Sequence, residues 1–160
     1  MYDRWLRMKN SGFTLLETLV VMAMTGILAA SAFGGYSKHL HKKNEAQATK
    51  MVYEIAQDLE IHRASNFSYK GFSTASYVLP EGATGSKVKY NISVIDGSAN
   101  APAINSTNAI GRDYIIRAVS TTTAAHSFLY TSKGMRCKNK ANNLVTNSGC
   151  GTAAQGSTSW

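Results

Sequence analysis

The sequence predicts an α+β fold in which one long N-terminal helix packs on a small antiparallel β-sheet. An apolar run at residues 13–36 contains a single charged side chain, Glu17. Apolar residues then recur at helical spacing to about residue 63, and beyond it short alternating runs are separated by Gly, Ser, Asn and Asp. A long helix followed by several turn-linked strands favours an antiparallel sheet covered by that helix.

The 160 residues divide into four expected segments. Residues 1–12 are expected to form a basic leader, and residues 13–36 a membrane-spanning helix of roughly twenty apolar residues, enough to cross a bilayer. Residues 37–64 continue as an amphipathic helix. Residues 65–160 form one globular head that ends in a disulfide-bounded loop.

The second half of the helix has one apolar face. Its members recur every three or four residues and are Ala48, Val52, Ile55 and Leu59. We expect this face to pack on the sheet. In the first half, glycines at positions 26, 34 and 35 leave two interpretations open. Either residues 26–35 form a weak helical stretch that melts on packing, or the glycines permit close contact between helices.

The head shows four strand patterns. In residues 87–95, four apolar side chains alternate with polar ones and predict one buried face, namely Val88, Tyr90, Ile92 and Val94. The other expected strands are residues 113–121, 127–132 and 135–138. Residues 65–85 are expected to form a connector, and residues 96–112 a loop. The order predicts an antiparallel meander beside the amphipathic helix.

Glu17 is unusual within the apolar run. A carboxylate inside a membrane costs at least about 2.5–3.5 kcal/mol, so it is expected to have a partner. Cleavage between Gly12 and Phe13 would supply one, because it creates a positively charged amine on Phe13. In a helix this amine lies four residues from Glu17 on the same face. The pair can form within one helix or between neighbouring copies, where it would set their axial register.

The stretch Gly12-Phe13-Thr14-Leu15-Leu16-Glu17 resembles the class III signal of type IV prepilins and pseudopilins. The resemblance implies a type IV pilin-like fold. It also implies that a membrane aspartyl peptidase cleaves after Gly12 and N-methylates Phe13, and that Glu17 acts in assembly. The stretch 66–72, after the amphipathic helix, resembles the same region of PilE-type minor pilins.

Two other interpretations of the N-terminus stay open. In a secretory signal peptide, Arg4, Arg7 and Lys9 would precede the apolar core, and cleavage after Ala32 would make Phe33 the first residue. In an ordinary single-pass anchor, Glu17 would be incidental. Sequencing the mature N-terminus separates Phe13 from Phe33.

Cys137 and Cys150 are the only cysteines. In an extracytoplasmic head they are expected to form a disulfide, the alternative being two free thiols. Pilins commonly carry a C-terminal disulfide-bounded loop that meets partners. The resemblance therefore directs attention to this loop and to the loop at residues 96–112 as contact surfaces.

The sequence predicts no enzyme, no catalytic residue, no metal site and no cofactor. Walker, H-E-x-x-H and nucleophile-elbow motifs are absent, and His126 beside a predicted strand is most simply a surface residue. The formal net charge is +8, and the first 12 residues contribute three basic side chains and one acidic one. A basic head is compatible with DNA, anionic lipid or a charged neighbour, and otherwise with a solvated surface.

The resemblance predicts a minor pilin, a structural subunit processed by prepilin peptidase and assembled at an inner-membrane platform into a type IV pilus. Its expected partners are major and minor pilin subunits and, before assembly, the lipid bilayer, with the head in the periplasm. The filament would support pilus biogenesis, twitching motility, adhesion or DNA uptake. Alternatives are a type II secretion pseudopilin and a DNA-binding competence pilin. The residues alone do not separate a minor from a major pilin.

Overall fold

The computed structural model describes residues 13–73 and 76–160, and describes residues 31–34 as helical backbone only. The chain divides into two units, residues 1–39 and residues 40–160. The second unit holds the sheet and is called the head below. The predicted leader lies outside the described residues.

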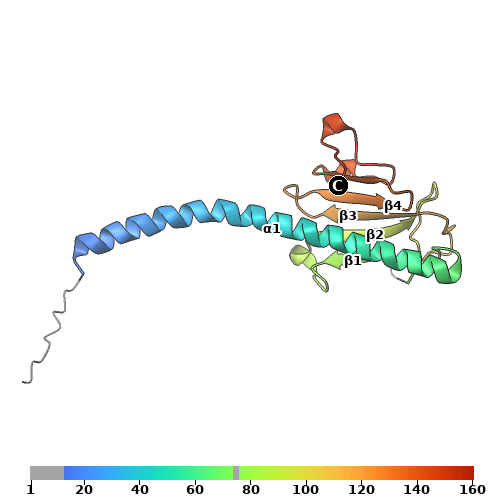
Figure 1. Cartoon of the computed structure of the whole chain (residues 1–160), viewed down its shortest axis with the longest axis horizontal. Coiled ribbons are helices and arrows are strands. Elements are labelled where there is room, and N and C mark those ends of the chain that lie inside the picture. The colour runs from blue at the N-terminus through green and yellow to red at the C-terminus, as the bar shows by residue number, and fades with distance from the viewer. Residues whose placement is uncertain (1–12, 74–75) are drawn as a thin grey trace, which may run out of the picture. The chain divides into compact units, whose positions relative to one another are not determined.

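One helix, α1 (Leu15–Asn66), contributes to both units (Figure 1). Its length of 52 residues agrees with the helix expected over residues 13–64. Thr14 is the N-cap, because its hydroxyl oxygen accepts a hydrogen bond of 3.2 Å from the amide of Glu17. At the other end, Phe67 has a φ of 57°, a left-handed conformation that cannot continue the helix.

The head contains a five-stranded sheet in which each strand pairs antiparallel with the next along the chain. The strands are β1 (Ser76–Leu79), β2 (Tyr90–Asp96), β3 (Tyr114–Ser120), β4 (Ser127–Thr131) and β5 (Arg136–Asn139). The α+β class and the meander are confirmed. The second half of α1 lies across one face of this sheet (Figure 1).

Two sequence-based boundaries in the head were wrong. The expected connector at residues 65–85 contains β1, a strand of only four residues that was hidden among Ser and aromatic residues. The strand expected from residue 87 begins at Tyr90, because residues 85–87 form a short 3-10 turn. Alternation already begins at Lys87, within that turn, so periodicity alone could not locate the start of β2.

The main core lies between α1 and the sheet. The four predicted helix positions are all buried there, with Ala48, Val52 and Leu59 having 0% exposure and Ile55 having 3%. They face alternate residues of the central strands, including Tyr90, Ile92, Val94, Ile116 and Phe128. The apolar face predicted from helical spacing is therefore the face that holds the head together.

The opposite face of the sheet has a smaller core. Ile115 and Leu129 pack there against Val145 and Cys150 of the C-terminal loop. Cys150 is joined to Cys137 by a disulfide. The loop thus covers the second face of the sheet, so it is more than a solvent-exposed ring.

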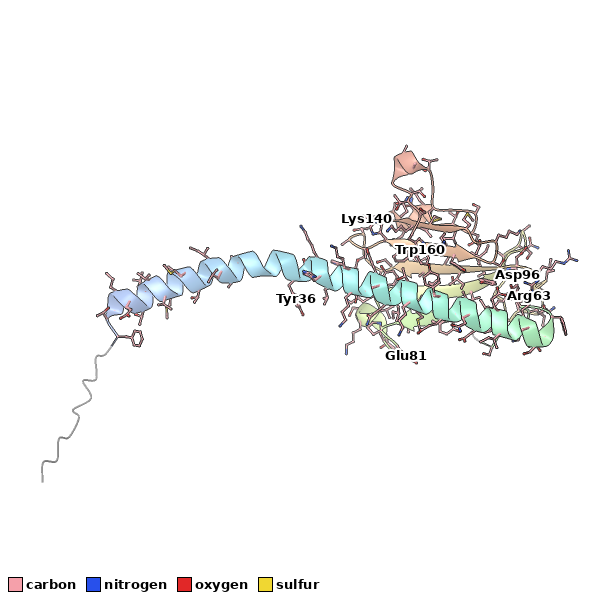
Figure 2. All side chains as sticks on the ribbon, in the orientation of Figure 1. Tyr36, Arg63, Glu81, Asp96, Lys140 and Trp160 are labelled. Carbon is pink, nitrogen blue, oxygen red and sulfur yellow. A yellow bond between two sulfur atoms is a disulfide. The ribbon has the colours of Figure 1, made fainter. Side chains whose placement is uncertain are left out.

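The C-terminal tail also packs on the head. Thr158 exchanges two backbone hydrogen bonds with Lys138 of β5, 2.8 and 3.1 Å long. Trp160 packs edge-on against Tyr53 of α1 and Phe128 of β4, with both ring-centroid distances 5.3 Å (Figure 2). Its indole nitrogen donates to the Cys137 carbonyl at 3.0 Å. Trp160 therefore links the helix to the sheet.

Candidate functional site

The first candidate site is the start of α1. Phe13 precedes the helix and is 78% exposed, and Glu17 lies in the first turn. The amides of Glu17 and Thr18 donate to the carbonyl of Thr14 at 3.1 and 3.2 Å. A carboxylate in the first turn is favoured by the unpaired amides and by the helix dipole.

The structure does not place Phe13 and Glu17 one turn apart in one helix, because the helix begins at Leu15. In the full-length chain the nitrogen of Phe13 is part of a peptide bond and carries no charge. The pairing predicted from sequence needs a free amine. It therefore remains a prediction for the cleaved chain, and Gly12, on the other side of the bond, lies outside the described residues.

The first part of α1 exposes apolar side chains on all sides. Leu15, Leu19, Met22 and Ile27 are between 64% and 85% exposed. An 18-residue window of this helix has a mean hydropathy of 1.8 and is 0% buried, so its length and composition suffice to cross a membrane. A secretory signal sequence meets the same criterion, so the motif before the helix has to distinguish the two.

Two threonine hydroxyls in the apolar part of this helix are satisfied locally. The Thr18 hydroxyl donates to Leu15 at 2.9 Å, and the Thr25 hydroxyl donates to Val21 at 2.9 Å. Such bonds remain possible in lipid. Within the described part of residues 1–39, the Glu17 carboxylate has no hydrogen bond or ion pair. The exposed acid thus stands out among neighbours that need no partner.

The second candidate site joins α1 to the sheet. Glu45 Oε1 accepts a hydrogen bond of 2.8 Å from the amide of His126 and lies 2.9 Å from Nδ1 of the same residue. Burial alone would raise the pKa of Glu45, but these hydrogen bonds from His126 outweigh it and lower the pKa below its ordinary value of 4.5.

His126 is not the simple surface residue that the sequence suggested. Its side chain is 26% exposed, and its carbonyl accepts a bond of 2.7 Å from the Tyr90 hydroxyl. The contact with Glu45 spans 81 positions of sequence. No local pattern connects residues so far apart, so sequence reasoning had no means to find this pair.

Asp96 organises the loop at residues 96–112. The buried carboxylate accepts hydrogen bonds from the amides of Ser98 at 2.9 Å and Gly111 at 2.6 Å. Burial would raise the pKa of Asp96, but bonds from Ser98, Gly111 and Ile110 lower it below 3.8. The two ends of the loop are thus held to one side chain.

The C-terminal loop is held in the same way by side-chain amides. Asn139 donates to the carbonyl of Cys150 at 2.8 Å, and Asn142 donates to that of Ser120 at 2.6 Å. Arg117 of β3 donates to the Asn147 side chain at 2.8 Å.

Among the described residues, no three His, Cys, Asp or Glu side chains lie close enough to hold a metal ion.

Comparisons with known proteins agree with the N-terminal motif. Residues 7–33 match the family model of the prokaryotic N-terminal methylation motif. The chain is 30% identical over 94 residues to the type IV major fimbrial protein FimA of Dichelobacter nodosus, covering 58% of this chain and 56% of that protein. It is 45% identical over 47 residues to the fimbrial protein EcpB of Eikenella corrodens, covering 29% and 28%.

A second Dichelobacter nodosus fimbrial protein is 33% identical over 97 residues, covering 58% of this chain and 56% of the relative. The chain thus spans little more than half the length of the Dichelobacter relatives that it matches. No solved structure matches it. The methylation motif, the similarity to fimbrial proteins and the long helix on an antiparallel sheet agree with one another: the chain is similar to type IV fimbrial proteins in all three.

Proposed function

We propose that this chain is a structural subunit of a type IV pilus. The observation that carries the proposal is the apolar first part of α1, which is exposed on all sides. Glu17 lies in its first turn, four residues after Phe13. Fully burying one Leu or Ile side chain stabilises by about 1.5–3 kcal/mol. A surface made of many such side chains is therefore strongly stabilised when it is removed from water.

Two environments bury this apolar surface, one before assembly and one in the filament. Before assembly the helix spans the inner membrane, where lipid surrounds it and the head lies in the periplasm. In the filament, helices of neighbouring copies replace the lipid. The disulfide between Cys137 and Cys150 supports a head outside the cytoplasm, where disulfides persist.

Processing would prepare Glu17 for this transfer. Prepilin peptidase cleaves after Gly12 and N-methylates Phe13, and the new amine then pairs with Glu17, either within its own helix or in a neighbour. A buried ion pair that loses one partner costs about 3–5 kcal/mol, so an incoming subunit would be favoured where acid and amine meet. The inner-membrane assembly platform and other pilin subunits are the partners.

The mature N-terminus tests this proposal. We expect mass spectrometry of the native protein to find a methylated Phe13 as the first residue. A chain that starts at Met1 or at Phe33 would contradict it. A Gly12→Leu variant should keep its first 12 residues, whereas the matched Ser11→Leu variant should be processed.

The class of pilin subunit and the class of filament are the finer parts of the proposal. The resemblance at residues 66–72 favours a minor pilin, whereas one curated relative is described as a major fimbrial protein. The number of copies in sheared pili distinguishes the two. A type II secretion pseudopilin is the second candidate, and recovery of the chain only in a secretion pseudopilus would favour it. The matched relatives are fimbrial proteins, and we propose no catalytic role.

The filament would serve twitching motility, adhesion or DNA uptake. A competence pilin that binds DNA through its basic head is the remaining candidate. Salt-sensitive binding of duplex DNA by the intact chain would favour that role, because binding that rests on phosphate contacts weakens as salt rises.

A further inference from the structure

One end of the head carries an unbalanced group of lysines. We call this group the basic pole and define it as Lys42, Lys43, Lys87, Lys89 and Lys140. Residues distant in sequence meet here because Tyr90 at the start of β2 pairs with Ser120 at the end of β3, and Ser127 at the start of β4 pairs with Asn139 at the end of β5. Lys89 and Lys140 flank these strand ends.

The helix reaches the same end of the head. Glu45 of α1 bonds His126, in the turn between β3 and β4, which places the start of the head's helix beside these strand ends. Lys42 and Lys43 lie in that first turn and are exposed. Lys140 is labelled at this end of the sheet in Figure 2, whereas Arg63 and Asp96 are labelled at the other.

Acidic side chains do not neutralise the basic pole. Glu45 is bonded to His126, and the charge of Lys138 acts on it as well. Glu81 lies to one flank, where it lines a groove together with Lys50 and Glu54. Among the described residues, none of the five lysines forms an ion pair. Five cationic groups therefore face solvent or lie near it without a counter-ion.

A small, mostly apolar hollow opens within this end of the head, with Leu40, Tyr90 and Ala125 in its wall. Its volume is about 80 Å³, and His41, Asn44, Lys89 and Thr122 contribute to its lining. These side chains come from α1, from the residue before β2 and from the turn after β3. Their polar groups form only a small part of the lining, so the attraction for an anion comes from the exposed lysines around the hollow.

The course of the chain indicates which anion lies near. Tyr36 is the last residue of the apolar run, and only five residues separate it from Lys42. The head therefore begins at its basic pole directly after the segment proposed to cross the bilayer. Lysines close to a membrane surface are attracted by anionic headgroups, and the attraction falls off within a Debye length, about 8 Å at physiological salt.

We propose that the basic pole binds the phosphate headgroups of anionic phospholipids while the subunit is anchored in the membrane. This inference rests on the membrane stage of the proposed function. The bilayer is favoured over DNA because the adjoining apolar segment holds the head at a lipid surface. It is favoured over a second copy because the other end of the head is not predominantly acidic: Arg63, Lys70, Arg112 and Lys133 lie there with Glu60, Asp113 and the buried Asp96 (Figure 2).

The experiment uses the full chain in lipid nanodiscs with one copy per disc, which excludes contacts between copies. Discs are made of phosphatidylcholine alone or with phosphatidylglycerol added, and a trace lipid carries a paramagnetic gadolinium chelate on its headgroup. Amide relaxation is measured by NMR. We expect several-fold larger relaxation enhancement at Lys42, Lys87 and Lys89 in the anionic discs, and loss of this difference at high salt.

Two triple variants with equal charge loss locate the contact. Replacing Lys42, Lys43 and Lys87 with Gln should remove most of the preference for anionic discs. The matched control replaces Lys70, Arg112 and Lys133 with Gln and should keep it. Equal enhancement in both lipid mixtures, or equal loss in both variants, would overturn the proposal.

Two further outcomes keep the proposals apart. If the chain enters both kinds of disc and its relaxation enhancement does not depend on lipid charge, only the lipid contact is contradicted. If the chain enters neither kind of disc, both the membrane stage and the lipid contact are contradicted. Short duplex DNA is added to the uncharged discs as a probe. If it perturbs the basic pole and anionic lipid does not, the surface binds nucleic acid and the lipid proposal is wrong.

Discussion

The two units of this chain treat their apolar and polar groups in opposite ways. In the first part of α1, Leu15 is 85% exposed and Met22 75% exposed, while the one carboxylate, Glu17, lies among them. In the head, Leu59 and Ile116 are fully buried, and buried polar groups such as Asp96 and Asn139 are hydrogen-bonded.

The two units therefore obtain their stability in different ways. The head meets most of its requirements with its own residues, since α1 and the C-terminal loop cover the two faces of the sheet and, among the described residues, only Arg117 Nε is a buried side-chain polar atom without a partner. The apolar helix presents both a surface and a charge that its own unit does not satisfy. Substitutions in the head should therefore change folding, and substitutions in the apolar helix should change association.

The largest effect is expected at Glu17. Replacing it with Ala leaves the helix equally able to enter a membrane but removes the acid that the Phe13 amine needs. We expect incorporation into filaments to fall at least about tenfold, since an unpaired buried charge costs about 3–5 kcal/mol. Quantitative immunoblots of sheared pili and of membranes measure both steps. Glu54→Ala, which removes an exposed acid of the head, is the control and should assemble normally.

The same comparison predicts opposite outcomes for two leucines. Leu59→Ala leaves a cavity in the main core, and we expect the free energy of unfolding of the head to fall by about 2–5 kcal/mol. Leu19→Ala removes a side chain that is 64% exposed, so the head should unfold as before. Urea unfolding of the full chain in detergent, followed by near-ultraviolet circular dichroism, measures both. A destabilised Leu19→Ala head would contradict the separation into two units.

The disulfide should have a somewhat smaller effect. Replacing Cys137 and Cys150 with Ser frees a loop with a sequence separation of 13. The chain-entropy model gives a loss of about 3 kcal/mol for a ring of this size. The same urea measurement tests this value. Membrane insertion should not change, because the substitutions leave the apolar residues 13–36 as they are.

Sequence reasoning succeeded where a pattern repeats locally. Helical spacing identified Val52 and Leu59 as core, and alternation identified Tyr90, Ile92 and Val94. It failed where the stabilising contact is distant in sequence. Glu45 meets His126, and Trp160 reaches Tyr53, although nothing near either residue indicates its partner. The strand β1 was missed because four residues are too few to show a period.

The two candidate surfaces also differ in how far the sequence could predict them. The short stretch around Phe13 and Glu17 could be recognised because its residues are consecutive, and the family match covers it. The basic pole could not be recognised, because its lysines come from α1, from a 3-10 turn and from the residues just before β2 and just after β5. Only the strand register brings them to one end of the head.

The smallest predicted effect is on how the free energy of unfolding of the head depends on pH. The pKa of Glu45 is lowered in the folded head, so the unfolded chain binds a proton more readily at acid pH. Its stabilising contribution is therefore present above the ordinary value of 4.5 and is lost as pH falls through the lower, folded value.

In Glu45→Gln we expect about 1 kcal/mol less stability at pH 7, because a charged acceptor is replaced by a neutral one. The variant should also lose less stability than the native chain between about pH 5 and pH 3. Its remaining loss of stability over this range should come largely from Asp96, whose pKa is also lowered. Urea unfolding across this range measures the slope. An unchanged slope in Glu45→Gln would mean that the contact with His126 does not link folding to protonation, and that the joint between helix and sheet is held by apolar packing alone.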